Sequence, residues 1–150
     1  MDTASAEAKG VSAVVCDASV LFKLLVPEED SAKARSLASS YQLIAPEIIF
    51  AEIGNVLCTQ IRSHGLSLEI GQTLLTRLDS FGLETHPVQP LLARALNIGH
   101  QLNHAIYDCL YLALAERLNL ALVSADRRFI SAVRRSRLRT AQVRMLGERA

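Results

Sequence analysis

The sequence lacks the features that mark membrane and secreted proteins. No apolar run approaches the roughly 20 residues that a membrane helix requires. The first ten residues, MDTASAEAKG, lack the basic start and the apolar stretch of a secretion signal. We therefore expect a cytoplasmic protein with no membrane partner, in which residues 1–10 form a flexible leader and residues 11–150 form one domain.

Cysteine and lysine are also scarce. Cys16, Cys58 and Cys109 are odd in number, far apart and set among apolar neighbours, which argues against a disulfide framework or a CxxC metal knot. We expect them to be small buried hydrophobic residues. No lysine occurs after Lys33, so charge that neutralises buried acids further along the chain must come from arginine, protons or a metal ion.

Short apolar runs alternate with helical segments through 150 residues, half of which are hydrophobic. This alternation predicts an α/β fold in which helices cover both faces of a parallel sheet, and ligands then bind outside the carboxyl ends of the strands. The strands are expected near 12–16, 42–45, 83–86, 120–123 and 143–146. The helices are expected near 19–26, 28–39, 46–63, 67–80, 87–101, 107–118 and 126–135, with Pro46 at the first helical position of the third.

Four acidic residues occupy unusual settings. Asp17 and Asp126 follow apolar strands directly or nearly so, whereas Glu52 and Asp108 lie in the apolar helical stretches IIFAEIGNVLC and AIYDCLYLALA. Asp17 and Asp126 could each be a helix cap, and Asp108 could satisfy amides of the first turn of its helix. Glu52 lies too far inside its helix to cap it. A buried carboxylate needs a partner, and hard oxygen ligands without nearby histidine or thiolate suit Mg²⁺ or Mn²⁺.

Positive charge collects in the second half of the chain. Residues 1–75 contain 5 lysines and arginines against 9 acids, whereas residues 76–150 contain 11 against 6. Such an excess either attracts polyanions or forms a solvated helix face. Six arginines fall within thirteen residues: Arg127, Arg128, Arg134, Arg135, Arg137 and Arg139.

Four segments together resemble the signature segments of the PIN-domain nucleases, and most of all the VapC-type toxins of toxin–antitoxin pairs. They are VVCDASVLFKLL, APEIIFAEIGNVL, YDCLYLALAERL and LVSADRRF. The resemblance implies a three-layer sandwich with a five-stranded parallel sheet, a homodimer formed through a helical hairpin at 46–80, and an antitoxin partner that blocks the acidic groove. It also assigns the metal-site acids Asp17, Glu52, Asp108 and Asp126, a water- or metal-orienting Ser124, and a supporting Asn55.

The expected activity is a Mg²⁺- or Mn²⁺-dependent endoribonuclease that hydrolyses RNA phosphodiester bonds. Asp17 and Asp108 would be the primary ligands, and Arg127, Arg128, Arg134 and Arg135 would contact the RNA backbone. Some family members carry a further acid after the fourth one, where Arg127 and Arg128 stand here, which leaves a second metal in question. One alternative is a non-catalytic PIN-like domain that only binds RNA or a partner.

Other enzyme classes fit the sequence less well. A haloacid-dehalogenase-type phosphatase needs DxD after its first strand, whereas Asp17 is followed by Ala18 and Ser19. A phosphoacceptor receiver domain needs a late lysine, which this chain lacks. His100 and His104 have the spacing of a helix-surface pair but lack the glutamate of HExxH, which disfavours zinc peptidase chemistry.

Overall fold

Five parallel strands form the centre of the computed structural model, which describes residues 11–138 and 142–149. Their order is β3-β2-β1-β4-β5, and each neighbouring pair is parallel. The predicted α/β fold with a five-stranded parallel sheet is therefore confirmed. The strands are β1 Ala13–Cys16, β2 Gln42–Pro46, β3 Glu84–His86, β4 Leu122–Ser124 and β5 Val143–Met145.

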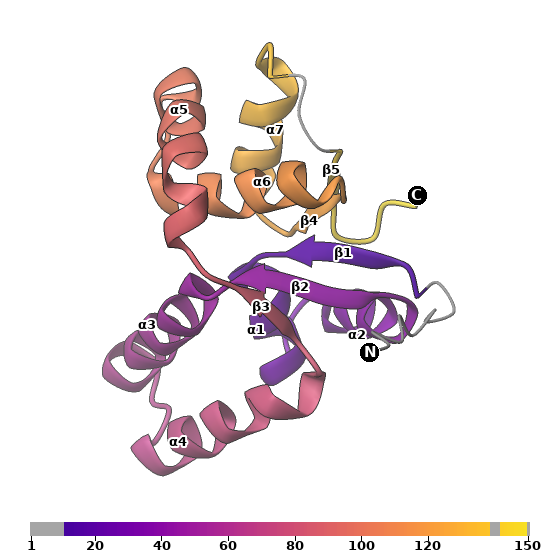
Figure 1. Cartoon of the computed structure of the whole chain (residues 1–150). Helices are drawn as coiled ribbons and strands as arrows, with labels where there is room; N and C mark the ends of the chain where they lie inside the picture. Colours follow the sequence, from indigo (N-terminus) through magenta and orange to yellow (C-terminus); the bar gives the residue numbers. More distant parts are fainter. Residues whose placement is uncertain (1–10, 139–141, 150) are drawn as a thin grey trace, which may run out of the picture.

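Seven α-helices connect and cover the strands of the described chain (Figure 1). They are α1 Ala18–Leu25, α2 Ser31–Ser40, α3 Ile48–Ser63, α4 Leu68–Arg77, α5 Leu92–Leu102, α6 Ile106–Leu118 and α7 Arg127–Arg135. Two short 3₁₀ helices are η1 Leu78–Phe81 and η2 Gln89–Leu91. In the described segments, none of these helices has the length and apolar character needed to cross a membrane.

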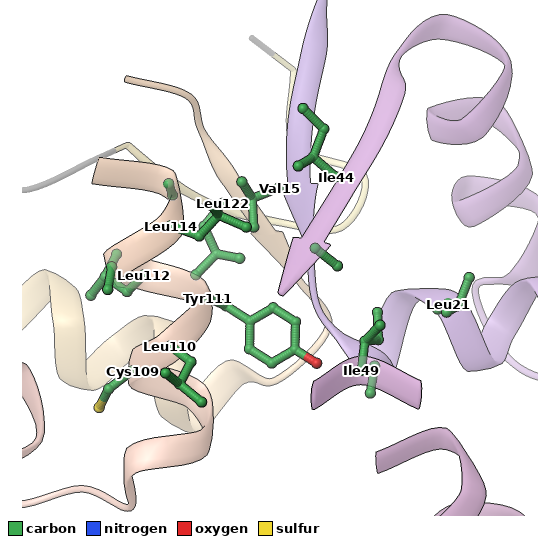
Figure 2. Close-up of a cluster of buried hydrophobic side chains, with 14 of the residues drawn as sticks. Val15, Leu21, Ile44, Ile49, Cys109, Leu110, Tyr111, Leu112, Leu114 and Leu122 are labelled. Atoms are coloured by element: carbon green, nitrogen blue, oxygen red, sulfur yellow. The ribbon is translucent and has the colours of Figure 1, made fainter. Parts of the chain in front are cut away.

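The central strands β1, β2 and β4 are buried on both faces, as their continuous apolar runs predict, whereas the edge strands β3 and β5 are partly exposed. In β1, Val15 packs into a large core with α6, while Val14 and Cys16 face a smaller core with α2. Figure 1 shows α5, α6 and α7 on one side of the strands and α1 and α2 on the other. Figure 2 shows Tyr111 in the large core, where its hydroxyl points from α6 toward the helix that carries Ile49. This three-layer arrangement places the carboxyl ends of β1 and β4 beside the start of α6.

The expected start of the second helix was wrong. Glu28 and Glu29 precede α2, which begins at Ser31, because Asp30 has a left-handed backbone (φ 66°) that a continuous right-handed helix cannot include. The Ser31 hydroxyl accepts a hydrogen bond from the Glu28 N–H instead. Glu28 and Glu29, which the expected range 28–39 placed in the first turn of that helix, therefore lie before it.

Three further local predictions need correction. Pro46 is the last residue of β2, in register with His86, rather than the first residue of α3. The fourth strand begins two residues later and ends one residue later than expected, so it includes Ser124. Cys16 and Cys109 are buried as predicted, but Cys58 is exposed on α3. In each case the apolar pattern identified the element, whereas the tertiary packing determined its ends and its outward face.

Candidate active site

Asp17 lies at the end of β1 and caps α1. Its Oδ1 accepts hydrogen bonds from the backbone N–H groups of Ser19 at 3.1 Å and Val20 at 3.3 Å, and from the Ser19 hydroxyl at 2.5 Å. The residue is buried, with only 7% of its surface exposed. Asp17 is therefore both a helix cap and a buried carboxylate. Its role as a cap is compatible with a role in the active site.

Ser124 connects Asp17 to the end of β4. Its hydroxyl donates to Asp17 Oδ2 and accepts the backbone N–H of Asp126 at 2.9 Å. Ser19 makes a parallel connection, because its hydroxyl accepts the Ala125 N–H at 2.9 Å. Ser124 is fully buried, so its direct contact is with the Asp17 carboxylate. These bonds hold the ends of two neighbouring strands, and with them Asp17, in one orientation.

Glu52 projects from α3 toward α6. Its Oε1 accepts a hydrogen bond of 2.5 Å from the hydroxyl of Tyr111, which is only 1% exposed. Burial and the nearby negative charge of Glu52 raise the pKa of Tyr111, so the phenol stays protonated and remains a donor. The tyrosine thus fixes one glutamate oxygen and leaves the other available.

Asp108 lies in the first turn of α6, close to His104. The distance from His104 Nε2 to Asp108 Oδ2 is 2.5 Å, and the imidazole ring also packs on Phe129 at a centroid distance of 5.0 Å. The apolar helix around Asp108 is buried from Cys109 to Ala115, whereas 31% of the Asp108 side chain itself is exposed. Asp108 lies close enough to Asp17 and Glu52 for the charges to interact.

A tight turn brings His104 to this position. Asn103 ends α5 with a left-handed backbone (φ 49°), and the His104 N–H donates to the Gly99 carbonyl at 3.0 Å. A Cβ atom on Gly99 would lie 3.0 Å from the His104 carbonyl oxygen, so the turn depends on a glycine there. His100 and His104 therefore do not form the helix-surface pair that their spacing suggested, since His104 lies beyond the end of α5.

Asp17, Glu52 and Asp108 lie within electrostatic range of one another. Burial, with a smaller contribution from the charge of Asp108, raises the pKa of Asp17 to about 6 despite its hydrogen bonds. Burial also raises the pKa of Glu52, and the charges of Asp108 and Asp17 add to that effect. Within the described residues, neither Asp17 nor Glu52 forms an ion pair with a basic side chain. We call these three residues the acidic cluster.

Asp126 caps α7 and is connected to Asp17 through Ser124, whose hydroxyl accepts the Asp126 N–H. Its Oδ1 accepts the N–H groups of Arg128 at 2.9 Å and Phe129 at 3.1 Å. It lines a cleft of about 640 Å³, and we call this the basic cleft. Its other polar lining residues are His104, Arg127, Arg128, Ser131 and Arg135. Since His104 bonds Asp108, the basic cleft begins next to the acidic cluster.

The predicted RNA-binding arginines do not all face this cleft. Arg128 and Arg135 are seven residues apart on α7 and line it together, whereas Arg134 turns away. The Arg134 guanidinium donates to Glu148 Oε2 at 2.6 Å and to the Val143 carbonyl at 3.3 Å, which ties α7 to the segment after β5. Arg137 is exposed after α7, and Arg139 lies outside the described residues.

Asn55 and Glu52 share one side of α3, as their spacing predicts, and both line an open hollow beside the start of α6. Across the part of the chain that the structure describes, no three acidic, histidine or cysteine side chains stand close enough to hold a metal ion as they are placed. The fold therefore brings Asp17, Glu52 and Asp108 within electrostatic range of one another, and Asp126 lines the neighbouring basic cleft.

Three contributing residues escaped sequence reasoning: Ser19, His104 and Tyr111. Each had a local signal, because Ser19 is two residues after Asp17, His104 is four before Asp108, and Tyr111 is the one polar side chain in CLYLALA. Spacing alone could not show which of these polar atoms meets a carboxylate. That required the packing of α6 against α3 and the turn after α5.

The fold is shared with several solved structures. PAE2754 from Pyrobaculum aerophilum is 20% identical with a TM-score of 0.66, covering 90% of this chain and 91% of that one. DNA-bound VapBC from Salmonella typhimurium is 16% identical with a TM-score of 0.62, covering 90% and 98%. VapBC-5 from Mycobacterium tuberculosis, a member of the VapBC family of toxin–antitoxin systems, is 19% identical with a TM-score of 0.54, covering 90% and 98%.

Identities of this size establish the likeness of fold alone, and no functionally curated protein matches the sequence significantly. The sequence itself is more informative. The profile of the PIN domain family matches residues 14–135, a span that contains the whole acidic cluster, Ser124 and Asp126. This match confirms the predicted family, and the chain belongs to the PIN domain family.

Proposed function

We propose that this protein is a divalent-metal-dependent ribonuclease whose active site is the acidic cluster together with Asp126. PIN domains are generally nucleases, which supports the reaction class. The observation that carries the proposal is a group of three carboxylates beside a cleft lined with arginine, in which neither Asp17 nor Glu52 has a basic partner in the described chain. Asp108 contacts the His104 imidazole, which also lines that cleft. Without a cation, these carboxylates repel one another, and the charge of Asp108 adds to burial in raising the pKa values of Asp17 and Glu52.

The donor set fits Mg²⁺ or Mn²⁺. Carboxylate oxygens are hard ligands, and a bound cation would offset both the burial that is the main cause of the raised pKa values of Asp17 and Glu52 and the repulsion that adds to it. Asp17, Glu52 and Asp108 would hold the ion, and Asp126 would contribute through its Oδ2, because its capping bonds use Oδ1. When bound, the ion would lower the pKa of water and stabilise charge on the phosphoryl group.

The neighbouring side chains would position these ligands. Ser19 and Ser124 hold Asp17, Tyr111 holds Glu52, and His104 holds Asp108. Such hydrogen bonds orient ligating carboxylates, and their loss typically weakens metal binding about 10- to 100-fold. We propose the same supporting role for Asn55, which lies beside Glu52 on α3.

The basic cleft would bind the RNA backbone. Arg127, Arg128 and Arg135 line it, and neutralisation of phosphates by their guanidinium groups releases counterions. The substrate strand would then pass from this cleft across the acidic cluster. RNA affinity is expected to fall steeply with added salt.

Cleavage of a labelled RNA in the presence of Mg²⁺ or Mn²⁺ tests the proposal directly. The wild-type protein is expected to cut it and to stop when EDTA is added. Asp17→Asn and Asp108→Asn are expected to abolish cutting, while Asp79→Asn, which changes an exposed acid far from the cluster, is expected to retain it. A wild-type protein that binds RNA but never cuts it would favour the non-catalytic alternative.

We also propose that the protein is the toxin of a toxin–antitoxin pair, made and inhibited in the cytoplasm. The fold it shares with VapBC-5 and VapBC supports an antitoxin partner. Co-expression with the product of the adjacent reading frame is expected to yield a stable complex without nuclease activity. A free, active protein that cells tolerate would contradict the toxin assignment.

The α3–α4 hairpin is the proposed homodimer surface, within residues 46–80. Its exposed apolar side chains are Phe50, Leu68, Ile70 and Leu75. Replacing Leu68 and Ile70 by lysine is expected to convert a dimer to a monomer in sedimentation velocity. The matched variant replaces the exposed Leu92 and Leu96 of α5 by lysine and is expected to leave the dimer intact.

A further inference from the structure

An open hollow of about 410 Å³ lies against the acidic cluster on the side of α3, and we call it the α3 hollow. Ile48 and Val56 form aliphatic walls, Tyr107 lines it from the start of α6, and Glu52 and Asn55 supply its polar groups. Its volume falls within the roughly 300–1,000 Å³ typical of small-ligand sites. Glu52 belongs to both the hollow and the acidic cluster, so anything in the hollow lies beside the proposed reaction site.

Tyr107 is the most exposed aromatic side chain of this protein, with 55% of the residue accessible to solvent. The chain has only 4 phenylalanines and 3 tyrosines and no tryptophan, and of these only Tyr107 and Phe50 are exposed. Tyr107 is also four residues before Tyr111, which places both rings on the α6 face that meets Glu52. Tyr111 is buried and holds Glu52, whereas the exposed Tyr107 ring lines the hollow.

We propose that the α3 hollow binds one unstacked nucleobase of a single-stranded RNA, next to the phosphate that is cut. This inference rests on the proposed ribonuclease function. An exposed tyrosine ring offers a stacking surface to any base, and the aliphatic walls exclude water from the opposite face. The Asn55 amide can both donate and accept hydrogen bonds, so it suits the edge of a base.

The distribution of charge agrees with this occupant. The basic cleft lies beside Asp108 through the His104 contact, and the α3 hollow lies beside Glu52. A strand whose phosphates lie in the basic cleft would cross the acidic cluster and bring its next base to the hollow. A duplex keeps its bases paired and stacked, so the hollow would select single-stranded substrates.

The test measures RNA affinity by fluorescence anisotropy in EDTA, where nothing is cut. Tyr107→Ala is expected to weaken binding of a single-stranded oligonucleotide roughly 5- to 100-fold, the effect of losing one base–aromatic stack. Tyr107→Phe keeps the ring and is expected to bind like the wild type. Leu96→Ala removes an exposed apolar side chain on α5 and serves as the matched control.

Oligonucleotides with a single abasic nucleotide at successive positions complete the test. At one position the abasic substitution is expected to weaken wild-type binding and to leave Tyr107→Ala binding unchanged, because the stack is already lost. Equal affinities of wild type and Tyr107→Ala for every oligonucleotide would overturn the inference while RNA cleavage by the wild type still supported the nuclease. A Tyr107→Ala protein with unchanged RNA affinity that becomes monomeric would also overturn it, because a second copy of the chain would then cover the hollow.

Discussion

The hydroxyl of Tyr111 donates a 2.5 Å hydrogen bond to Oε1 of Glu52, across 59 residues of sequence. It joins α6 to α3 at the bottom of the proposed active site. We expect Tyr111→Phe to weaken Mn²⁺ binding about 10- to 100-fold, because Glu52 loses its orientation. The free energy of unfolding should change by only about 1 kcal/mol, the net value of one hydrogen bond.

Calorimetry of Mn²⁺ binding and thermal unfolding separate these two effects. Tyr41→Phe removes a hydroxyl from the opposite side of the sheet and is the matched control, with no expected change in Mn²⁺ affinity. A Tyr111→Phe protein with wild-type Mn²⁺ affinity would show that Tyr111 supports only the core.

The raised pKa of Asp17 predicts an unusual dependence of stability on pH. Its folded-state pKa is about 6, against an ordinary value of 3.8, so the native state holds a proton that the unfolded state releases between these values. Asp17 therefore contributes to the free energy of unfolding at low pH, and this contribution is lost as pH rises through about 6. Asp17→Asn should therefore stabilise the metal-free protein above that pH by up to about 3 kcal/mol.

Urea unfolding in EDTA at several pH values measures this difference. The gain of Asp17→Asn over the wild type should be large at pH 7.5 and vanish near pH 4. Added Mn²⁺ should stabilise the wild type and leave the variant unchanged. Equal unfolding free energies at pH 7.5 in EDTA would contradict the burial of an ionised Asp17.

The contact between His104 and Asp108 predicts a role in metal binding. His104→Ala removes the ring nitrogen that lies 2.5 Å from Asp108 Oδ2, and we expect a loss of Mn²⁺ affinity of about 10-fold. His104→Gln keeps an N–H donor at a similar reach and should retain most of the Mn²⁺ affinity that His104→Ala loses. Mn²⁺ titration of both variants checks this, and equal losses in the two would count against the positioning role.

The arginines of α7 should differ in their effect on RNA binding. Arg128→Ala and Arg135→Ala each remove a side chain from the basic cleft, so each should weaken binding and lower the salt slope by about 0.7. Arg134→Ala should leave that slope unchanged, because the Arg134 guanidinium is bonded to Glu148. The check is RNA affinity at a series of KCl concentrations, and a slope that responds equally to all three would refute this assignment.

Much of this protein is decided by its local sequence. The apolar run that stops at Asp17 and the LALV run before Asp126 identify two strands, and parallel strands bring their carboxyl ends to one edge. The proximity of Asp17 to Ser124 could be expected from that argument. Helix ends were less predictable, because the left-handed Asp30 and the strand position of Pro46 depend on contacts with other elements.

The partners of the acids were decided only by the tertiary structure. Arg134 and Arg135 are neighbours in sequence, yet Arg134 pairs with Glu148 while Arg135 lines the basic cleft, because successive residues of a helix point about 100° apart. Likewise, Tyr111 meets Glu52 and His104 meets Asp108 only after α6 has packed against α3 and α5. The sequence by itself determined the parallel sheet and the acids at its edge, since apolar periodicity and strand direction are local properties. Which acids gather, and what orients them, depended on long-range packing that periodicity does not encode.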